Sequence, residues 1–155
     1  MKNTIIVAPH PDDEIIGNFE ILTTTHPMII YDADTFKKRR DIALKLKEHA
    51  DISIQLFHKN IPAPFLNKEN TIYIPDPIYE LHPLHRYWGN IGEQLARDGY
   101  DIVFYSTNMN APYIHEVKKS SEKEELLNKV YPDQSDLWKY DKKYILFEGR
   151  TKWIF

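Results

Sequence analysis

One histidine and three carboxylates stand together near the N-terminus, in the run His10-Pro11-Asp12-Asp13-Glu14. A short β-branched and apolar stretch precedes the run, so it directly follows a predicted buried strand. Open parallel sheets bind ligands outside the carboxyl ends of their strands, which is where this run falls. Asp12 and Asp13 also have a simpler interpretation, as acceptors for the free N–H groups of a helix that begins near Glu14. Taken by itself, the run supports either interpretation.

Two further histidines, His82 and His85, occur together at the start of another predicted helix. Catalytic zinc commonly takes three protein ligands from His, Asp and Glu, and it leaves one position open for water. The chain has no cysteine, so histidine and carboxylate are the metal ligands that it offers. We predict that His10, Asp13 and His85 form the ligand set. Zn2+ is the expected ion, and another divalent metal is an open alternative because such sets accept several ions.

The two remaining polar groups of these runs have predicted catalytic roles. Asp12 is adjacent to Asp13 in the chain, and because adjacent side chains diverge, Asp12 is left free to act as a general base. His82 is then placed to donate a hydrogen bond to the developing oxyanion. Zinc polarises a carbonyl and lowers the pKa of bound water to about 7, so the predicted reaction is hydrolysis of an acyl group.

Strand patterns alternate with helical patterns along the chain, which predicts an α/β fold. We expect a Rossmann-like, doubly wound, mostly parallel sheet with helices on both faces, in one domain that spans residues 1–155. The expected strands are Thr4–Ala8, Met28–Tyr31, Ile52–Phe57, Thr71–Ile74, Ile102–Tyr105 and Pro112–Val117. The expected helices are a segment from about Glu14 to Leu22, Lys37–His49, Leu84–Arg97 and Glu122–Val130.

Three expectations concern other parts of the chain. The segments Tyr144–Phe147 and Lys152–Phe155 predict a terminal hairpin. The charge run Lys118–Glu125 is interpreted as a solvated helix face with neighbours of opposite sign. Arg40 is a candidate for binding a substrate through hydrogen bonds, although an ordinary surface role is the simpler explanation.

Charge and composition restrict the class of partner. The chain has 20 basic and 23 acidic residues and a net charge of −3, which argues against a nucleic-acid backbone as the main partner. The apolar stretch Ile5–Ala8 is too short for a signal peptide or a membrane span, so we expect no membrane insertion and a cytoplasmic location. The expected partner is a small-molecule or glycan substrate. The sequence has no signal for an oligomeric state.

At the two histidine-containing runs the sequence resembles the LmbE-like, or PIG-L, family of zinc-dependent de-N-acetylases. In that family a His-Pro-Asp-Asp-Glu motif ends the first strand, and a later His-Pro-Asp-His motif contains two further histidines. The resemblance implies that His10, Asp13 and His85 bind zinc, that Asp12 is the base and that His82 assists at the oxyanion. The implied activity is removal of an acetyl group from an N-acetylglucosamine-type sugar by attack of zinc-bound water.

The sequence also departs from that family. Leu84 stands where the second motif has an acidic residue, and Asn18 and Phe19 follow Gly17 where the family has several glycines. Two alternatives therefore remain open: a catalytically silent glycan or nucleotide-sugar binding module of the same fold, and a hydrolase of another amide or an ester. Retention of Asp12 favours an enzyme, because a binding module has no need of a base beside the metal.

Overall fold

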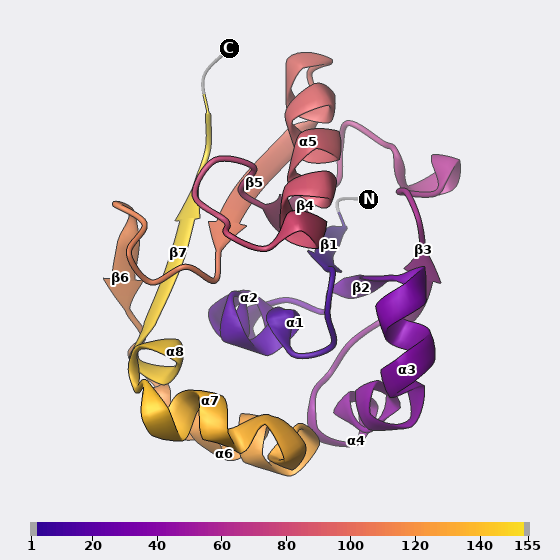
Figure 1. Cartoon of the computed structure of the whole chain (residues 1–155). Helices are drawn as coiled ribbons and strands as arrows, with labels where there is room; N and C mark the ends of the chain where they lie inside the picture. Colours follow the sequence, from indigo (N-terminus) through magenta and orange to yellow (C-terminus); the bar gives the residue numbers. More distant parts are fainter. Residues whose placement is uncertain (1–2, 154–155) are drawn as a thin grey trace.

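A seven-stranded sheet runs through the computed structural model, which describes residues 3–153 (Figure 1). The strands are β1 (Thr4–Ala8), β2 (Met28–Asp32), β3 (Ile54–His58), β4 (Thr71–Pro75), β5 (Asp101–Ser106), β6 (Ile114–Glu116) and β7 (Phe147–Thr151). Their order across the sheet is β3-β2-β1-β4-β5-β7-β6. Strands β1 to β5 pair in parallel, whereas β7 runs antiparallel to β5 and β6. The predicted α/β class with a mostly parallel open sheet is confirmed.

Helices of very different lengths connect the strands. They are α1 (Asp13–Ile16), α2 (Phe19–Thr24), α3 (Ala33–Leu44), α4 (Leu46–His49), α5 (Pro83–Arg97), α6 (Ser120–Val130), α7 (Ser135–Tyr140) and α8 (Lys143–Leu146), with two 3-10 turns at Ala63–Phe65 and Pro132–Gln134. Within residues 3–153, none of the helices combines the length and the apolar character that crossing a membrane requires.

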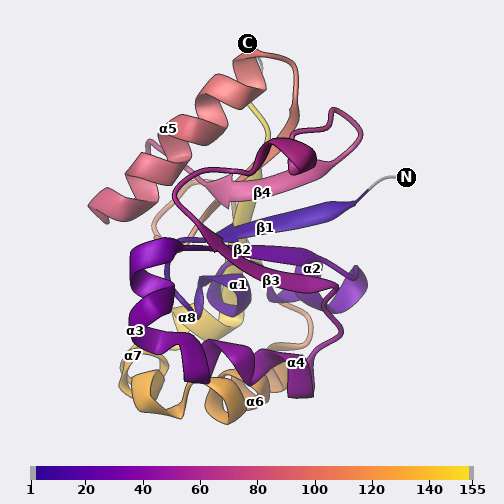
Figure 2. The ribbon, with the colours of Figure 1, turned by 90° about the vertical axis from the view of Figure 1, so that its right-hand side faces the viewer.

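Two apolar clusters pack against the two faces of the sheet. Helix α5 lies on one face with the turn Ala63–Phe65, and the other helices lie on the opposite face (Figure 2). Side chains alternate along β2, so that Ile30 joins the α5 cluster while Ile29 and Tyr31 join the other. All three are fully buried. Coverage on both faces explains why the central strands are apolar on both sides.

The chain changes direction across the sheet between β1 and β4. From β1 it proceeds through β2 to β3 at one edge, and it then returns to β4 and β5 on the other side of β1. Strands β1 and β4 pair in parallel, so their carboxyl ends lie side by side. Open α/β sheets bind ligands in the crevice at such a reversal. The segments that follow β1 and β4 are therefore the expected location of a site.

Two predicted helices differ from those observed near the N-terminus. The helix expected to continue to Leu22 is interrupted at Gly17, where a Cβ atom would lie 2.6 Å from the Tyr105 ring. Helix α3 begins at Ala33 rather than Lys37, because the Asp32 side chain accepts a hydrogen bond from a backbone N–H in its first turn. A break then separates α3 from α4.

The predicted terminal hairpin is wrong. Most of its first segment, Tyr144–Phe147, belongs to helix α8, and the strand that follows, β7, pairs with β5 and β6. The last residues of its second segment lie outside the described part of the chain. The observed pairing brings Glu148 and Arg150 back to the N-terminal helices, where Arg150 Nη1 donates to the Gly17 carbonyl oxygen at 3.1 Å.

The interpretation of Lys118–Glu125 as a wholly solvated face is wrong for one residue. The side chains of Lys123 and Glu148 are 0% exposed, and Lys123 Nζ lies 2.9 Å from Glu148 Oε2. Lys123 also donates to the Ile16 carbonyl oxygen at 2.7 Å. Glu148 accepts from the Phe19 backbone N–H at 3.0 Å. This buried pair therefore ties α6 and β7 to the junction between α1 and α2.

Candidate metal centre

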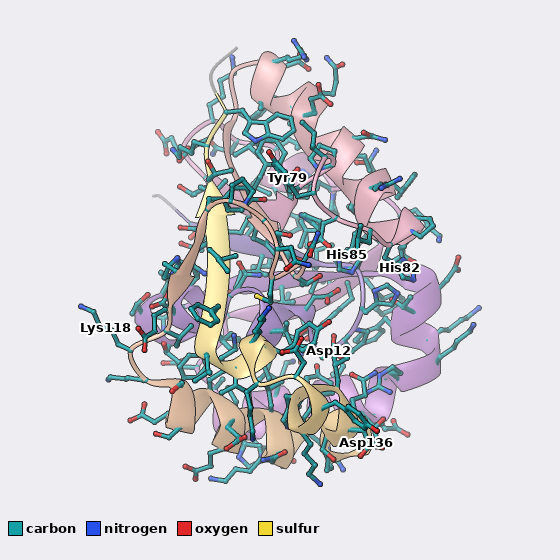
Figure 3. All side chains as sticks on the ribbon, turned by 60° about the vertical axis from the view of Figure 1, so that its left-hand side comes forward. Asp12, Tyr79, His82, His85, Lys118 and Asp136 are labelled. Carbon is teal, nitrogen blue, oxygen red and sulfur yellow. The ribbon has the colours of Figure 1, made fainter. Side chains whose placement is uncertain are left out.

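The structure brings the two histidine-containing segments together at the carboxyl ends of β1 and β4. His10 lies in the loop after β1, and Asp13 is the first residue of α1. His85 lies in the first turn of α5, whose preceding loop starts at the end of β4. Figure 3 shows His82 and His85 at the end of α5 that is nearest Asp12. The switch between β1 and β4 thus positions every residue of the two predicted motifs.

Three potential ligand atoms approach one another closely: His10 Nδ1, Asp13 Oδ2 and His85 Nε2. The two ring nitrogens are 3.1 Å apart. The Asp13 oxygen lies 3.5 Å from the His10 nitrogen and 2.9 Å from the His85 nitrogen. Tetrahedral zinc with bonds of about 2.0–2.1 Å requires ligand atoms roughly 3.3 Å apart. The spacing and the chemistry of these donors therefore fit a zinc ion.

The charges around His85 favour a cation at this place. Burial opposes the charged imidazole, but the carboxylates of Asp13 and Glu80 outweigh burial and raise the pKa of His85 to about 10. Burial likewise favours the neutral form of Asp13, but His85 and His10 hold the pKa of that carboxyl well below its ordinary value. Two carboxylates thus require positive charge between them, which either a proton or a metal ion supplies.

Glu80 is a site residue that no sequence motif marks. Its side chain is buried, and Glu80 Oε2 lies 3.3 Å from His85 Nδ1, although this contact lacks hydrogen-bond geometry. Thr107 holds the carboxylate through its backbone N–H at 2.5 Å and its hydroxyl at 3.0 Å. Metal-binding histidines usually direct their second ring nitrogen to a carboxylate or carbonyl group, which orients the ring. Glu80 is placed to do this for His85.

Asp12 combines backbone strain, burial and an unpaired carboxylate. Its φ of 128° is the only positive φ at a non-glycine residue in the range 3–153, and such a conformation costs about 1–3 kcal/mol. Asp12 is 7% exposed, and no hydrogen bond or ion pair from the described residues reaches its carboxylate. Burial and the adjacent charges of Asp13 and Glu14 raise the pKa of Asp12 well above its ordinary value. A carboxylate in this state is suited to accept a proton.

The Glu14 side chain helps to hold the strained backbone at Asp12. One of its carboxylate oxygens accepts from the Asp12 backbone N–H at 3.2 Å, and the other accepts from the Tyr131 hydroxyl. Burial raises the pKa of Glu14 to about 7, although the hydrogen bond from Tyr131 opposes this shift. The conformation at Asp12 therefore depends on a residue 117 positions away in the chain.

His82 lies at the edge of the ligand cluster. Its Nδ1 atom accepts from the Leu84 backbone N–H at 3.1 Å and so caps helix α5. The proton of the neutral ring is then on Nε2. Burial and the charges of His10 and His85 lower the pKa of His82, which favours this neutral form. The His82 and His10 ring centroids are 4.5 Å apart, so a hydrogen-bond donor lies beside the proposed metal position.

Two cavities open beside the cluster. One has a volume of about 300 Å3 and borders Glu80 and His82. The second has a volume of about 630 Å3 and borders Asp12. Asp141 and Tyr144, in the turn and helix that follow α7, line both cavities. A substrate therefore has room on the side of the candidate oxyanion donor and on the side of the candidate base.

Arg40 is the predicted site residue that the structure does not bring to the cluster. It is exposed on α3 and lines neither cavity. The adjacent Arg39 is half-buried and donates to Asp133 at 2.7 Å, and its charge opposes the rise in the pKa of Asp12. Helix α3 departs from helical geometry at Arg39, with φ −130° and ψ 22°. No sequence pattern distinguishes these two adjacent arginines.

Comparison with known proteins identifies no relative. No protein-family model, no curated protein and no solved structure matches the chain. The function must therefore be inferred from the donor set, the residues around it and the cavities beside it.

Proposed function

We propose that the chain is a metal-dependent hydrolase that removes an acetyl group from the amide nitrogen of an N-acetylglucosamine-type sugar. The observation that supports catalysis most strongly is the unpaired, buried carboxylate of Asp12 beside three converging ligand atoms. A site that only binds a metal has no use for a strained residue with an unpaired charge.

The donor set defines the proposed cofactor. His10, Asp13 and His85 would hold Zn2+, which when bound supplies a Lewis acid for the acyl carbonyl and makes water reactive near neutral pH. Glu80, whose Oε2 lies 3.3 Å from His85 Nδ1, would help to orient that ring by charge attraction. Asp13 remains ionised because its pKa lies below the ordinary value.

Two side chains perform the proton and charge steps. Asp12 takes a proton from the attacking water and then passes it to the nitrogen of the leaving amine. Its raised pKa suits both steps, because a base whose pKa is closer to the working pH also releases its proton readily. His82 donates a hydrogen bond from Nε2–H to the carbonyl oxygen as negative charge develops. The amide C–N bond breaks, and acetate and a free amine are the products.

The proposal extends to the fold type and the family. The strand order β3-β2-β1-β4-β5, with helices on both faces, supports a Rossmann-like, doubly wound arrangement to which β7 and β6 add an antiparallel edge. Membership of the LmbE-like de-N-acetylases is proposed from the two histidine motifs. The close approach of both motifs in space is consistent with this assignment.

The test is release of acetate from N-acetylglucosamine derivatives by the full chain with zinc, with a chelator and with variants. Asp12→Asn is expected to reduce turnover by about 10²–10⁴-fold while bound zinc stays stoichiometric. His85→Ala is expected to lose tight zinc binding. Asp51→Asn removes a carboxylate that is 80% exposed and serves as the control with full activity.

Three outcomes would change the proposal. Full activity of Asp12→Asn would exclude Asp12 as the base. Bound zinc without release of acetate from any substrate would favour the catalytically silent module. Hydrolysis of esters or other amides, with N-acetylated sugars left intact, would retain the hydrolase and change the bond.

A further inference from the structure

The larger cavity, beside Asp12, has a lining of one charge sign. Its volume is about 630 Å3. Besides Asp12 it is lined by Gln134, Asp136, Leu137, Tyr140, Asp141 and Tyr144. Among the described residues, no lysine, arginine or histidine contributes to this lining. Carboxylates and aromatic rings thus form the wall next to the proposed base.

Among the described residues, no lysine, arginine or histidine forms an ion pair with the carboxylates that line this cavity. Asp12 is 7% exposed, lines the cavity and has no partner for its carboxylate in the described part of the chain. The adjacent Lys142 is paired with Glu124 at 2.8 Å, and Arg39 is paired with Asp133 at 2.7 Å. The carboxylates of Asp136 and Asp141, beside Asp12, therefore favour a positively charged ligand in this cavity.

Two tyrosine rings add a second preference. Tyr140 is 95% exposed, and Tyr144 lines the cavity from the following helix. Figure 3 shows Asp136 on helix α7, on the side of the molecule that also presents Asp12. Aromatic faces attract alkylammonium groups, and carboxylates form charge-assisted hydrogen bonds with them. Phosphate or carboxylate groups would be repelled by the same wall.

We infer that this cavity binds a second, positively charged amino group of the substrate. The preferred substrates are then N-acetylated molecules that contain a free primary ammonium group several atoms from the amide. This inference rests on the proposed hydrolysis and specifies its substrate class. The ammonium group belongs either to a glucosamine unit linked to N-acetylglucosamine or to an alkyl diamine, and both present the same chemistry to the wall.

A series of matched compounds tests the preference. N-acetylputrescine provides the cation, N-pentylacetamide replaces its ammonium by a methyl group, and N-acetyl-5-aminovalerate provides an anion at a similar distance. Monoacetylated chitobiose, which has a free ammonium group, and diacetylated chitobiose, which has none, provide the same comparison for a sugar substrate. The expected order of kcat/KM with the zinc-loaded chain is cation, neutral, anion, with roughly tenfold between the first two. This ratio is expected to fall at high salt.

Two double variants show where the preference originates. Asp136→Asn with Asp141→Asn is expected to bring the ratio of cation to neutral compound close to one. The Asn at position 141 retains an acceptor for the Lys143 backbone N–H, which Asp141 now accepts at 3.0 Å. Asp51→Asn with Glu125→Gln removes two exposed carboxylates elsewhere and is expected to leave the ratio unchanged.

The outcomes separate this inference from the proposed function. Hydrolysis of neutral N-acetylated sugars without any preference for cations would overturn the inference and leave the hydrolase intact. If no compound is hydrolysed, calorimetric titration of the zinc-loaded chain with putrescine decides. Binding that the Asp136/Asp141 double variant loses would support the cavity while the hydrolase fails, and no binding would overturn both.

Discussion

Carboxylates are buried at both ends of helix α1, but their interaction partners differ. At the C-terminal end, Glu148 lies 2.9 Å from Lys123 and 2.7 Å from Arg150, and it also accepts two backbone N–H groups. At the N-terminal end, the Asp12 carboxylate has no partner within residues 3–153, and Glu14 is held by hydrogen bonds without a cation. The carboxylate of Glu148 is thus paired with two cations, whereas that of Asp12 has no cation partner.

This difference distinguishes charges that hold the structure from charges that are available to a ligand. Helix α1 has four residues, which is too short to be stable without tertiary contacts. Its position depends on the donors that Lys123 and Arg150 direct at the Ile16 and Gly17 carbonyl groups. A fully paired C-terminal end therefore supports an N-terminal end where an unpaired carboxylate costs stability.

The largest expected effect comes from removing an ion-pair partner of Glu148 at the C-terminal end of α1. Lys123→Met is expected to lower the free energy of unfolding by about 3–5 kcal/mol, because Glu148 loses one cation and the Ile16 carbonyl loses its donor. Urea unfolding measures this change. Lys129→Met removes an exposed pair with Glu125 and, as the control, should change stability by less than about 1 kcal/mol. Equal effects of the two variants would contradict the comparison.

At the N-terminal end of α1, the buried carboxyl group of Glu14 should make the free energy of unfolding depend on pH. The folded chain raises the pKa of Glu14 to about 7, above its ordinary value of 4.5, so its stabilising contribution is complete below pH 4.5 and is lost as the pH rises to 7. The Glu14→Gln variant has no carboxyl group at this position, so its stability does not fall in this way. With chelator present, the variant is expected to gain roughly 3 kcal/mol relative to the parent across that window. Parallel unfolding free energies of the two chains from pH 4.5 to 7 would contradict the assignment.

A smaller effect is expected at the carboxylate behind the ligand cluster. Glu80→Gln is expected to weaken zinc binding by about 10–100-fold, because His85 loses the charged group that orients its ring. Competition with a chromophoric chelator measures the affinity. Glu116→Gln, on an exposed position of β6, provides the control. Unchanged affinity in Glu80→Gln would mean that the packing of α5 orients His85 without help from Glu80.

Much of the fold could be predicted because the central strands are apolar on both faces. The predicted strand Thr4–Ala8 has the observed bounds, and the helix predicted at Leu84–Arg97 differs by one residue at its start. The C-terminal segment was mistaken because a short apolar run such as Tyr144–Phe147 fits a helix or a strand equally well. The position of β7 between β5 and β6 depends on distant contacts that no local pattern records.

The candidate site also has one part that sequence motifs predict and another part that they do not. His10, Asp12, Asp13 and His85 belong to compact motifs, and the structure brings these residues together. Other contributors reach the site from parts of the sequence with no motif. Glu80 stands in an irregular loop, Tyr131 follows α6, and Lys123 is buried within a run of charges that resembles a solvent-exposed surface.

The long-range contacts of the N-terminal helices also lead to an expected order of events during folding. The ligand cluster joins His10, in the loop after β1, to His85, 75 positions away on α5. The contacts that hold α1, α2 and the Asp12 loop join positions 107 to 129 apart. Longer loops close more slowly because their closure costs more entropy. A refolding chain is therefore expected to bring β1 and β4 together before the loop at Asp12 is held in its final conformation.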